Sequence, residues 1–158
     1  MSEGKKYDTG KPAAVFNYNK GKSILLHDNW RACEIYTWVG EISHGRNIEL
    51  SVRTVANLLR GYFPKLQLAS SVSDCYVYGA NKYGRNNYTG VSLSRYASAL
   101  VRHLDAYFFK TDDNINDDES GIHHIKHAFA NLLIMLEIID DMGIHGDFDL
   151  FKEFTEKD

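Results

Sequence analysis

The sequence has few prolines, few cysteines and no long hydrophobic run. Its 158 residues include only 2 Pro, which favours long uninterrupted helices. The 2 Cys, Cys33 and Cys75, form neither a disulfide framework nor a CxxC pair, as is typical of a reducing compartment. The N-terminus lacks a signal-peptide core, and the longest apolar run, 132–136, is too short to span a bilayer. We therefore expect a soluble cytoplasmic protein without membrane contacts.

A strong excess of one charge is also absent. The formal net charge is −3, so no overall basic field favours stable binding of duplex nucleic acid. Residues 20–23 resemble the end of a P-loop, but Phe16 stands where that motif requires its first glycine. The length fits one domain, 1–158, whose core needs no disulfide.

Apolar residues recur with a helical period along most of the chain. The stripe from Ile48 to Leu59 predicts an amphipathic helix that stops at Gly61 and Pro64. The segment 28–39 is predicted as a helix or a strand, followed by a turn at 40–47. Further helices are expected at about 65–82, from Ser92 or Ser94 to about 110, at 119–142 and at 148–154. No alternating pattern supports a sheet, so the predicted fold is all-α, a bundle of about four to six helices.

The densest group of polar side chains lies where a loop is predicted to enter the 119–142 helix. His124, His127 and Asn131 are spaced i, i+3 and i+7, which places them within roughly 60° of one helix face. The acidic residues Asp117, Asp118 and Glu119 precede them closely. Imidazoles and carboxylates that converge are ligands for a divalent ion such as Mn, Co, Ni or Zn. The alternative interpretation is a capping carboxylate with solvent-facing histidines.

The helix that carries these residues is apolar nearly all round. Such a helix lies centrally in a bundle or at an oligomer interface, so we expect a homo-oligomer. Polar residues at one end of it must find partners in a partly buried place, where bundles usually form their ligand sites.

Basic residues are predicted to lie near this site. Arg95 and Arg102 are seven residues apart on one helix, and Lys82 and Arg85 flank a glycine-bounded loop at 83–90. Cations beside a metal suit a polyphosphate, although ordinary surface charge gives the same pattern. In this loop, Asn87 and Tyr88 are candidates to recognise a base by hydrogen bonding and stacking. The alternative is that they are ordinary turn residues that bind no ligand.

Several motifs occur in order along the chain and resemble a known family. They are KYD-x-GKP at 6–12, YGA-x-KYG-x-x-NY at 78–88, then Arg95, RHL-x-A at 102–106, and D-x-ESG-x-x-H-x-x-H at 117–127 followed by Asn131. Their order and spacing resemble the phage-encoded dATP/dGTP diphosphohydrolase N-terminal domain family. That family is distantly similar to the all-helical MazG-type nucleoside triphosphate pyrophosphohydrolases. The resemblance covers about 1–12 and 78–137.

The chain departs from the family pattern in three respects. Tyr88 stands where the family usually has Trp, and 13–77 is longer than the expected helical link. The paired glutamates of an earlier MazG helix are missing, and Glu137 and Asp140 are interpreted as surface or capping residues. We therefore divide the domain into an N-terminal arm or loop, a variable helical insertion, a motif-bearing helical core and a C-terminal helix. These segments are 1–27, 28–77, 78–142 and 143–158.

The resemblance implies hydrolysis of dGTP or dATP to the monophosphate and pyrophosphate. The expected location is the cytoplasm, which is the host cytoplasm if a phage encodes the protein. The cofactor is expected to be a divalent metal, Mg, Mn or Co, with Zn as a further option. The expected metal ligands are His103, Glu119, His124 and His127. The expected catalytic residues are His103, Asp118 and Glu119. The expected substrate-binding residues are Lys11, Lys82, Tyr83, Arg85, Asn87, Tyr88, Arg95, Arg102 and Asn131.

Two other functional classes remain open. A metal phosphohydrolase of the HD type also uses His and Asp on helices, but Leu104 separates His103 from Asp105, and the adjacent pair His27–Asp28 lies near the N-terminus. The other class is a non-catalytic phage protein that binds or sequesters nucleotides. The released product distinguishes the two classes from the pyrophosphohydrolase.

Overall fold

The computed structural model describes residues 11, 13–17, 20–26, 28–84 and 90–157. Within these ranges the chain forms eight α-helices, two short 3-10 helices and no strand, which confirms the all-α prediction. Six of the helices have eight residues or more, and α1 and α4 are shorter. The helices are α1 (Lys20–Leu25), α2 (Trp30–Ser43), α3 (Ile48–Tyr62), α4 (Leu68–Ser71), α5 (Ser73–Tyr83), α6 (Leu93–Phe108), α7 (His124–Met142) and α8 (Leu150–Lys157). The 3-10 helices are η1 (Ala14–Asn17) and η2 (Pro64–Leu66).

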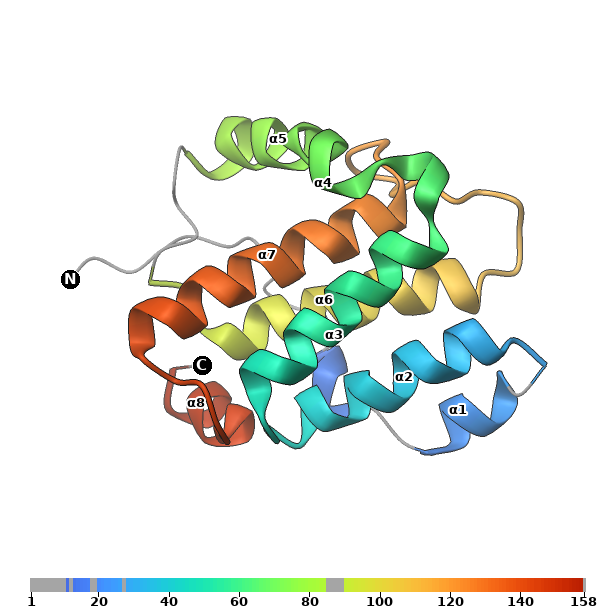
Figure 1. Ribbon diagram of the computed structural model, residues 1–158. Coiled ribbons are helices and arrows are strands. Elements are labelled where there is room, and N and C mark those ends of the chain that lie inside the picture. Colours follow the sequence, from blue (N-terminus) through green and yellow to red (C-terminus); the bar gives the residue numbers. More distant parts are fainter. Residues whose placement is uncertain (1–10, 12, 18–19, 27, 85–89, 158) are drawn as a thin grey trace.

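Helices α6 and α7 form the centre of the bundle. They lie side by side, and the segment 109–123 joins the end of α6 to the start of α7 (Figure 1). Their facing apolar residues, including Leu100, Leu104, Ile125 and Leu132, are fully buried. Helices α2 and α3 pack together on one side, with α3 against α7, whereas α5 lies on another side of α7 (Figure 1). The interior is therefore organised around the two helices that carry the predicted site.

Helix α2 resolves the choice between helix and strand at 28–39. Asn29 caps it, since its side-chain oxygen accepts a hydrogen bond of 3.1 Å from the backbone N–H of Ala32. Its buried positions follow a helical period rather than alternation, which explains how its aromatic and β-branched residues fit a helix. The predicted turn at 40–47 is wrong at its start, because Gly40 is buried inside the helix.

The predicted helix at 65–82 is broken into shorter pieces. Gln67 has φ +47°, in the left-handed region, and this residue separates η2 from α4. Val72 then separates α4 from α5. A left-handed residue interrupts the helical hydrogen bonds, so η2 and α4 are separate segments.

Helix α7 starts later than the sequence predicted. The ring of His123 caps it by accepting a hydrogen bond of 3.0 Å from the N–H of Ile125. The preceding residues form a turn in which the N–H of Gly121, at φ +73°, donates to the carbonyl of Asp117 over 2.7 Å. Asp118 and Glu119 therefore lie in a loop and not on the helix.

Both ends of the described chain pack against α6. Ala14 and Val15 of η1 are buried, and the N–H of Val15 lies 3.4 Å from the hydroxyl of Ser98. From α8, the buried carboxylate of Glu153 accepts a hydrogen bond of 2.8 Å from the N–H of Ser94 in the first turn of α6. A carboxylate there offsets the positive end of the helix dipole. None of the helices in the described ranges combines the length and apolar composition that crossing a membrane requires.

Candidate functional site

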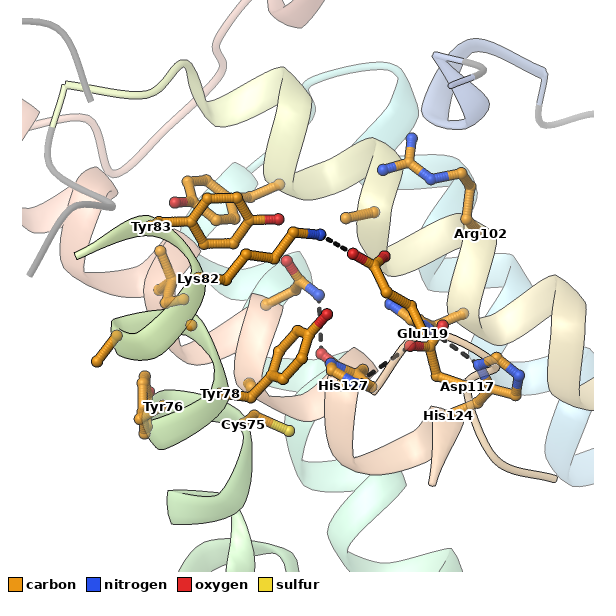
Figure 2. A pocket seen from close by; sticks show the side chains of 18 of the residues that line it. Cys75, Tyr76, Tyr78, Lys82, Tyr83, Arg102, Asp117, Glu119, His124 and His127 are labelled. Atoms are coloured by element: carbon orange, nitrogen blue, oxygen red, sulfur yellow. Dashed lines mark hydrogen bonds and ion pairs between the residues drawn. The ribbon is translucent and has the colours of Figure 1, made fainter. Parts of the chain in front are cut away.

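A pocket of about 770 Å³ lies between α5 and the central pair α6 and α7. This volume is in the range of small-molecule sites. Tyr78, Lys82 and Tyr83 of α5 form one wall, and the loop 109–123 contributes Asp117 and Glu119 from the other side (Figure 2). The pocket therefore collects residues from three helices and a loop that are far apart in the sequence.

Two histidines and an aspartate converge at one end of this pocket. His103 of α6, Asp117 of the loop and His124 of α7 each offer one ligand atom, and these atoms lie within 4.8 Å of one another. The Nδ1 atoms of His103 and His124 are 2.9 Å apart. All three residues are half-buried. Two imidazoles and a carboxylate form a donor set that fits Mn, Co or Zn.

His127 belongs to the same cluster through Ser120. Its ring stacks on that of His103, with 4.5 Å between ring centroids, and its Nε2 lies 2.6 Å from the hydroxyl oxygen of Ser120. Asp117 Oδ2 accepts two hydrogen bonds from Ser120, 2.8 Å from the N–H and 2.9 Å from the hydroxyl. Because the hydroxyl proton goes to Asp117, we infer that His127 donates its Nε2–H to Ser120. The turn thus connects Asp117 to α7.

The electrostatics of the cluster favour the protonation states that a metal requires. Burial, followed by the nearby charge of His127, holds the pKa of His103 well below its usual range. Burial also lowers the pKa of His124. For Asp117, burial acts to raise the pKa, but the hydrogen bonds from Ser120 and the neighbouring histidines outweigh it and the pKa is lowered. Neutral imidazoles beside an ionised carboxylate are the forms that bind metals.

Glu119 lies outside this three-residue group. Its carboxylate pairs with the ammonium group of Lys82 and lies 3.6 Å from that of Lys11. The hydrogen bond from Lys82 chiefly lowers the pKa of Glu119. We expected Glu119 to converge with His124 and His127, whereas the group of close ligand atoms in the structure combines Asp117 with His103 and His124. The signal for Asp117 was present, because Asp117 begins the motif and Ser120 follows at the spacing of a side-chain-capped turn.

The other predicted residues divide between the pocket and its surroundings. Asp118 is exposed and accepts a hydrogen bond of 3.2 Å from the side chain of Asn114. Asn131 is buried and donates to the carbonyl of His127 over 2.8 Å. The residues predicted to bind substrate that line the pocket are Lys11, Lys82, Tyr83, Arg102 and Asn131. Arg95 is not among the residues that line it. Arg85, Asn87 and Tyr88 lie outside the described residues.

Beyond the histidines the pocket is lined by both apolar and polar side chains. They are Tyr96 and Ala99 of α6 and Ala130, Asn131, Ile134 and Glu137 of α7. From His127 to Ile134 is seven residues, which corresponds to about 10 Å along the helix. The pocket therefore suits an elongated molecule with an anionic part and a flat or apolar part.

Two comparisons with known proteins point to the same family. Residues 53–145, more than half of the chain, match the family described as "dATP/dGTP diphosphohydrolase, N-terminal". The chain is similar to a dATP/dGTP diphosphohydrolase of Salmonella phage PMBT28, with 33% identity over 69 residues. These residues are 44% of this chain and only 23% of that relative. No solved structure matches the chain at a significant level.

Proposed function

The chain belongs to the dATP/dGTP diphosphohydrolase N-terminal family, and we propose that it is a metal-dependent nucleotide pyrophosphohydrolase. The reaction cleaves dGTP or dATP to the monophosphate and pyrophosphate. The observation that carries the proposal is the group of His103, Asp117 and His124 in a pocket that is large enough for a nucleotide and is also lined by Lys11, Lys82 and Arg102. The name of the phage relative supports this substrate class.

His103, Asp117 and His124 would hold the divalent ion. Their nitrogen-rich donor set favours Mn, Co or Zn over Mg, which prefers oxygen ligands. When bound, the ion supplies charge neutralisation at the phosphate oxygens and activation of a water. His127 and Ser120 act as positioning residues, because they hold the ring of His103 by stacking and the carboxylate of Asp117 by hydrogen bonds.

The remaining residues of the pocket orient the substrate. Arg102 lines the pocket one residue before His103 and would stabilise charge that develops on the phosphoryl group. The part of the pocket beyond the histidines, with Tyr96 and Ile134, would receive the base and the sugar. Burial of the base between aromatic and aliphatic side chains excludes water and fixes the α-phosphate near the histidine cluster.

A product assay tests this function. The chain is incubated with each of the four deoxynucleoside triphosphates and with Mg, Mn, Co or Zn, and the products are separated. We expect pyrophosphate and monophosphate from dGTP or dATP, with Mn or Co more effective than Mg. Release of inorganic triphosphate would instead assign an HD-type reaction. Nucleotide binding with no product would assign a non-catalytic binding protein.

A matched pair of variants links the activity to the cluster. Asp117→Asn removes one charge and one metal ligand, and we expect at least about a tenfold loss of Mn affinity, since even outer contacts to a metal ligand are worth 10–100-fold. Asp113→Asn removes the same charge from an exposed position of the same loop and should leave Mn affinity unchanged. Equal Mn affinity of both variants would reject Asp117 as a ligand.

A further inference from the structure

Three donor groups surround the carboxylate of Glu119 at one side of the pocket. Lys82 forms an ion pair with it, and the ammonium of Lys11 lies 3.6 Å from it (Figure 2 shows the contact with Lys82). The hydroxyl of Tyr78 faces the same carboxylate (Figure 2), and after burial its interaction with Glu119 is the next cause that raises the pKa of Tyr78. The donors come from α5 and from the N-terminal segment, whereas Glu119 comes from the loop before α7. Separate segments thus converge on one anionic group.

This arrangement has the composition of an anion-binding site. Burial alone would lower the pKa of Lys82, but hydrogen bonds to Glu119 and Tyr83 raise it above the ordinary value, so the ammonium stays charged. The same pocket contains His103, Asp117 and His124. A phosphate group offers the same kind of acceptor oxygen as a carboxylate and carries more charge.

We propose that Lys82, Lys11 and Tyr78 form the binding site for the terminal phosphates of a nucleoside polyphosphate, and that Glu119 occupies this site until the polyphosphate displaces it. The inference rests on the proposed function, because it assumes that the pocket receives a nucleotide. It adds that the polyphosphate binds to the lysines as Glu119 is displaced from them, so that the two events are a single exchange.

The exposure of the partners makes this exchange favourable. The side chains of Lys11 and Glu119 are 45% and 47% exposed, and that of Lys82 is 22% exposed. An ion pair as exposed as this one is weakened by water and salt. A polyphosphate brings several negative charges to the same two ammonium groups, so it replaces a single carboxylate with a net gain. Before the ligand arrives, Glu119 offsets the repulsion between the two ammonium groups and holds both at the same place.

Binding of inorganic triphosphate in metal-free buffer, measured by calorimetry at low salt, tests the exchange. Glu119→Gln removes the competing charge and keeps the shape, so we expect about three- to fivefold tighter binding than in the wild type, the upper part of the range expected for loss of a weak exposed ion pair. Lys82→Ala should bind at least about tenfold more weakly. Asp113→Asn, which removes an exposed charge from the same loop, should stay within about twofold of the wild type.

The outcomes separate this inference from the proposed function. Equal or weaker binding of triphosphate by Glu119→Gln overturns the exchange, and so does unchanged binding by Lys82→Ala. Because the assay contains no metal and no nucleoside, a chain that fails to hydrolyse dGTP can still show the expected order of affinities. If the chain hydrolyses dGTP but does not show that order of triphosphate affinities, the proposed function stands and only the exchange is refuted.

Discussion

Ser120→Ala is the most informative single change at the site, because one hydroxyl connects the aspartate to the histidine. The oxygen of Ser120 lies 2.9 Å from Asp117 Oδ2, 2.6 Å from His127 Nε2 and 3.2 Å from the N–H of Ile122. Alanine removes the donor to a charged carboxylate and leaves two N–H groups without this acceptor. All four residues are half-buried, so water reaches them only in part.

The magnitude follows from these contacts. A hydrogen bond to a charged group is worth about 1.5–3 kcal/mol, and an unsatisfied buried donor costs about 1–3 kcal/mol. Partial replacement by water reduces the sum, so we expect a loss of about 2 kcal/mol in the free energy of unfolding. For a chain of this length, about 2 kcal/mol lowers the Tm by roughly 4–8 °C. Mn affinity should also fall about 10–100-fold, as is usual when a hydrogen bond to a metal ligand is lost.

Urea denaturation followed by circular dichroism measures the first effect, and calorimetric titration with Mn measures the second. Ser70→Ala is the matched control, because Ser70 is exposed and makes one hydrogen bond of 3.1 Å to the carbonyl of Gln67. That variant should stay within about 0.5 kcal/mol of the wild type. If Ser120→Ala were as stable as Ser70→Ala and bound Mn normally, Ser120 would not position Asp117.

Four further predictions concern packing, pH, phosphate recognition and assembly. Gly45→Ala should destabilise the fold by more than about 3 kcal/mol in urea, because Gly45 has φ +68° and a Cβ would lie 1.7 Å from the carbonyl oxygen of Phe148. The pKa of His103 is below its unfolded value of 6.5, so the unfolded chain binds the extra proton and the stability of the metal-free protein should fall as pH drops below about 6.5. The slope is at most about 1.4 kcal/mol per pH unit, and His103→Gln should flatten it in urea titrations across that range. Arg102→Ala should leave the Tm nearly unchanged and reduce turnover about a hundredfold or more, whereas wild-type turnover would exclude a phosphate contact. Light scattering should give a mass above that of one 18.0 kDa chain, and a monomer mass would reject the predicted homo-oligomer.

The helices with strong periodicity were predictable from sequence alone. The stripe from Ile48 to Leu59 became α3, and both α6 and the body of α7 lie close to their expected positions. Their apolar residues repeat at helical spacing over three turns or more, so local pattern and tertiary packing agree. Gly40 and Gln67 were not predictable in this way. Gly40 is held in a helix by burial, and Gln67 adopts a left-handed conformation that its residue type does not favour.

The candidate site was predictable in composition but not in detail. The spacing of His124 and His127 placed them correctly on one helix, and the RHL motif brought His103 into reach from α6. Residue type alone did not predict which of the three successive acidic residues lies beside the histidines. A turn stabilised by Ser120 and Gly121 directs Asp117 to the histidines and Glu119 to the lysines, so backbone geometry makes the assignment.

The contact between the carboxylate of Glu153 and the first turn of α6 affects where this chain can be truncated. The family match ends at residue 145, but α8, which carries Glu153, begins at Leu150. At the other end, η1 and α2 precede the matched segment and bury Val15 and Ile35. A fragment cut at the limits of family similarity would lose a helix cap and expose part of the interior. Expression fragments should therefore follow the packing of the helices and keep the flanking segments, since the unit shared among relatives is smaller than the unit that holds α6 in place.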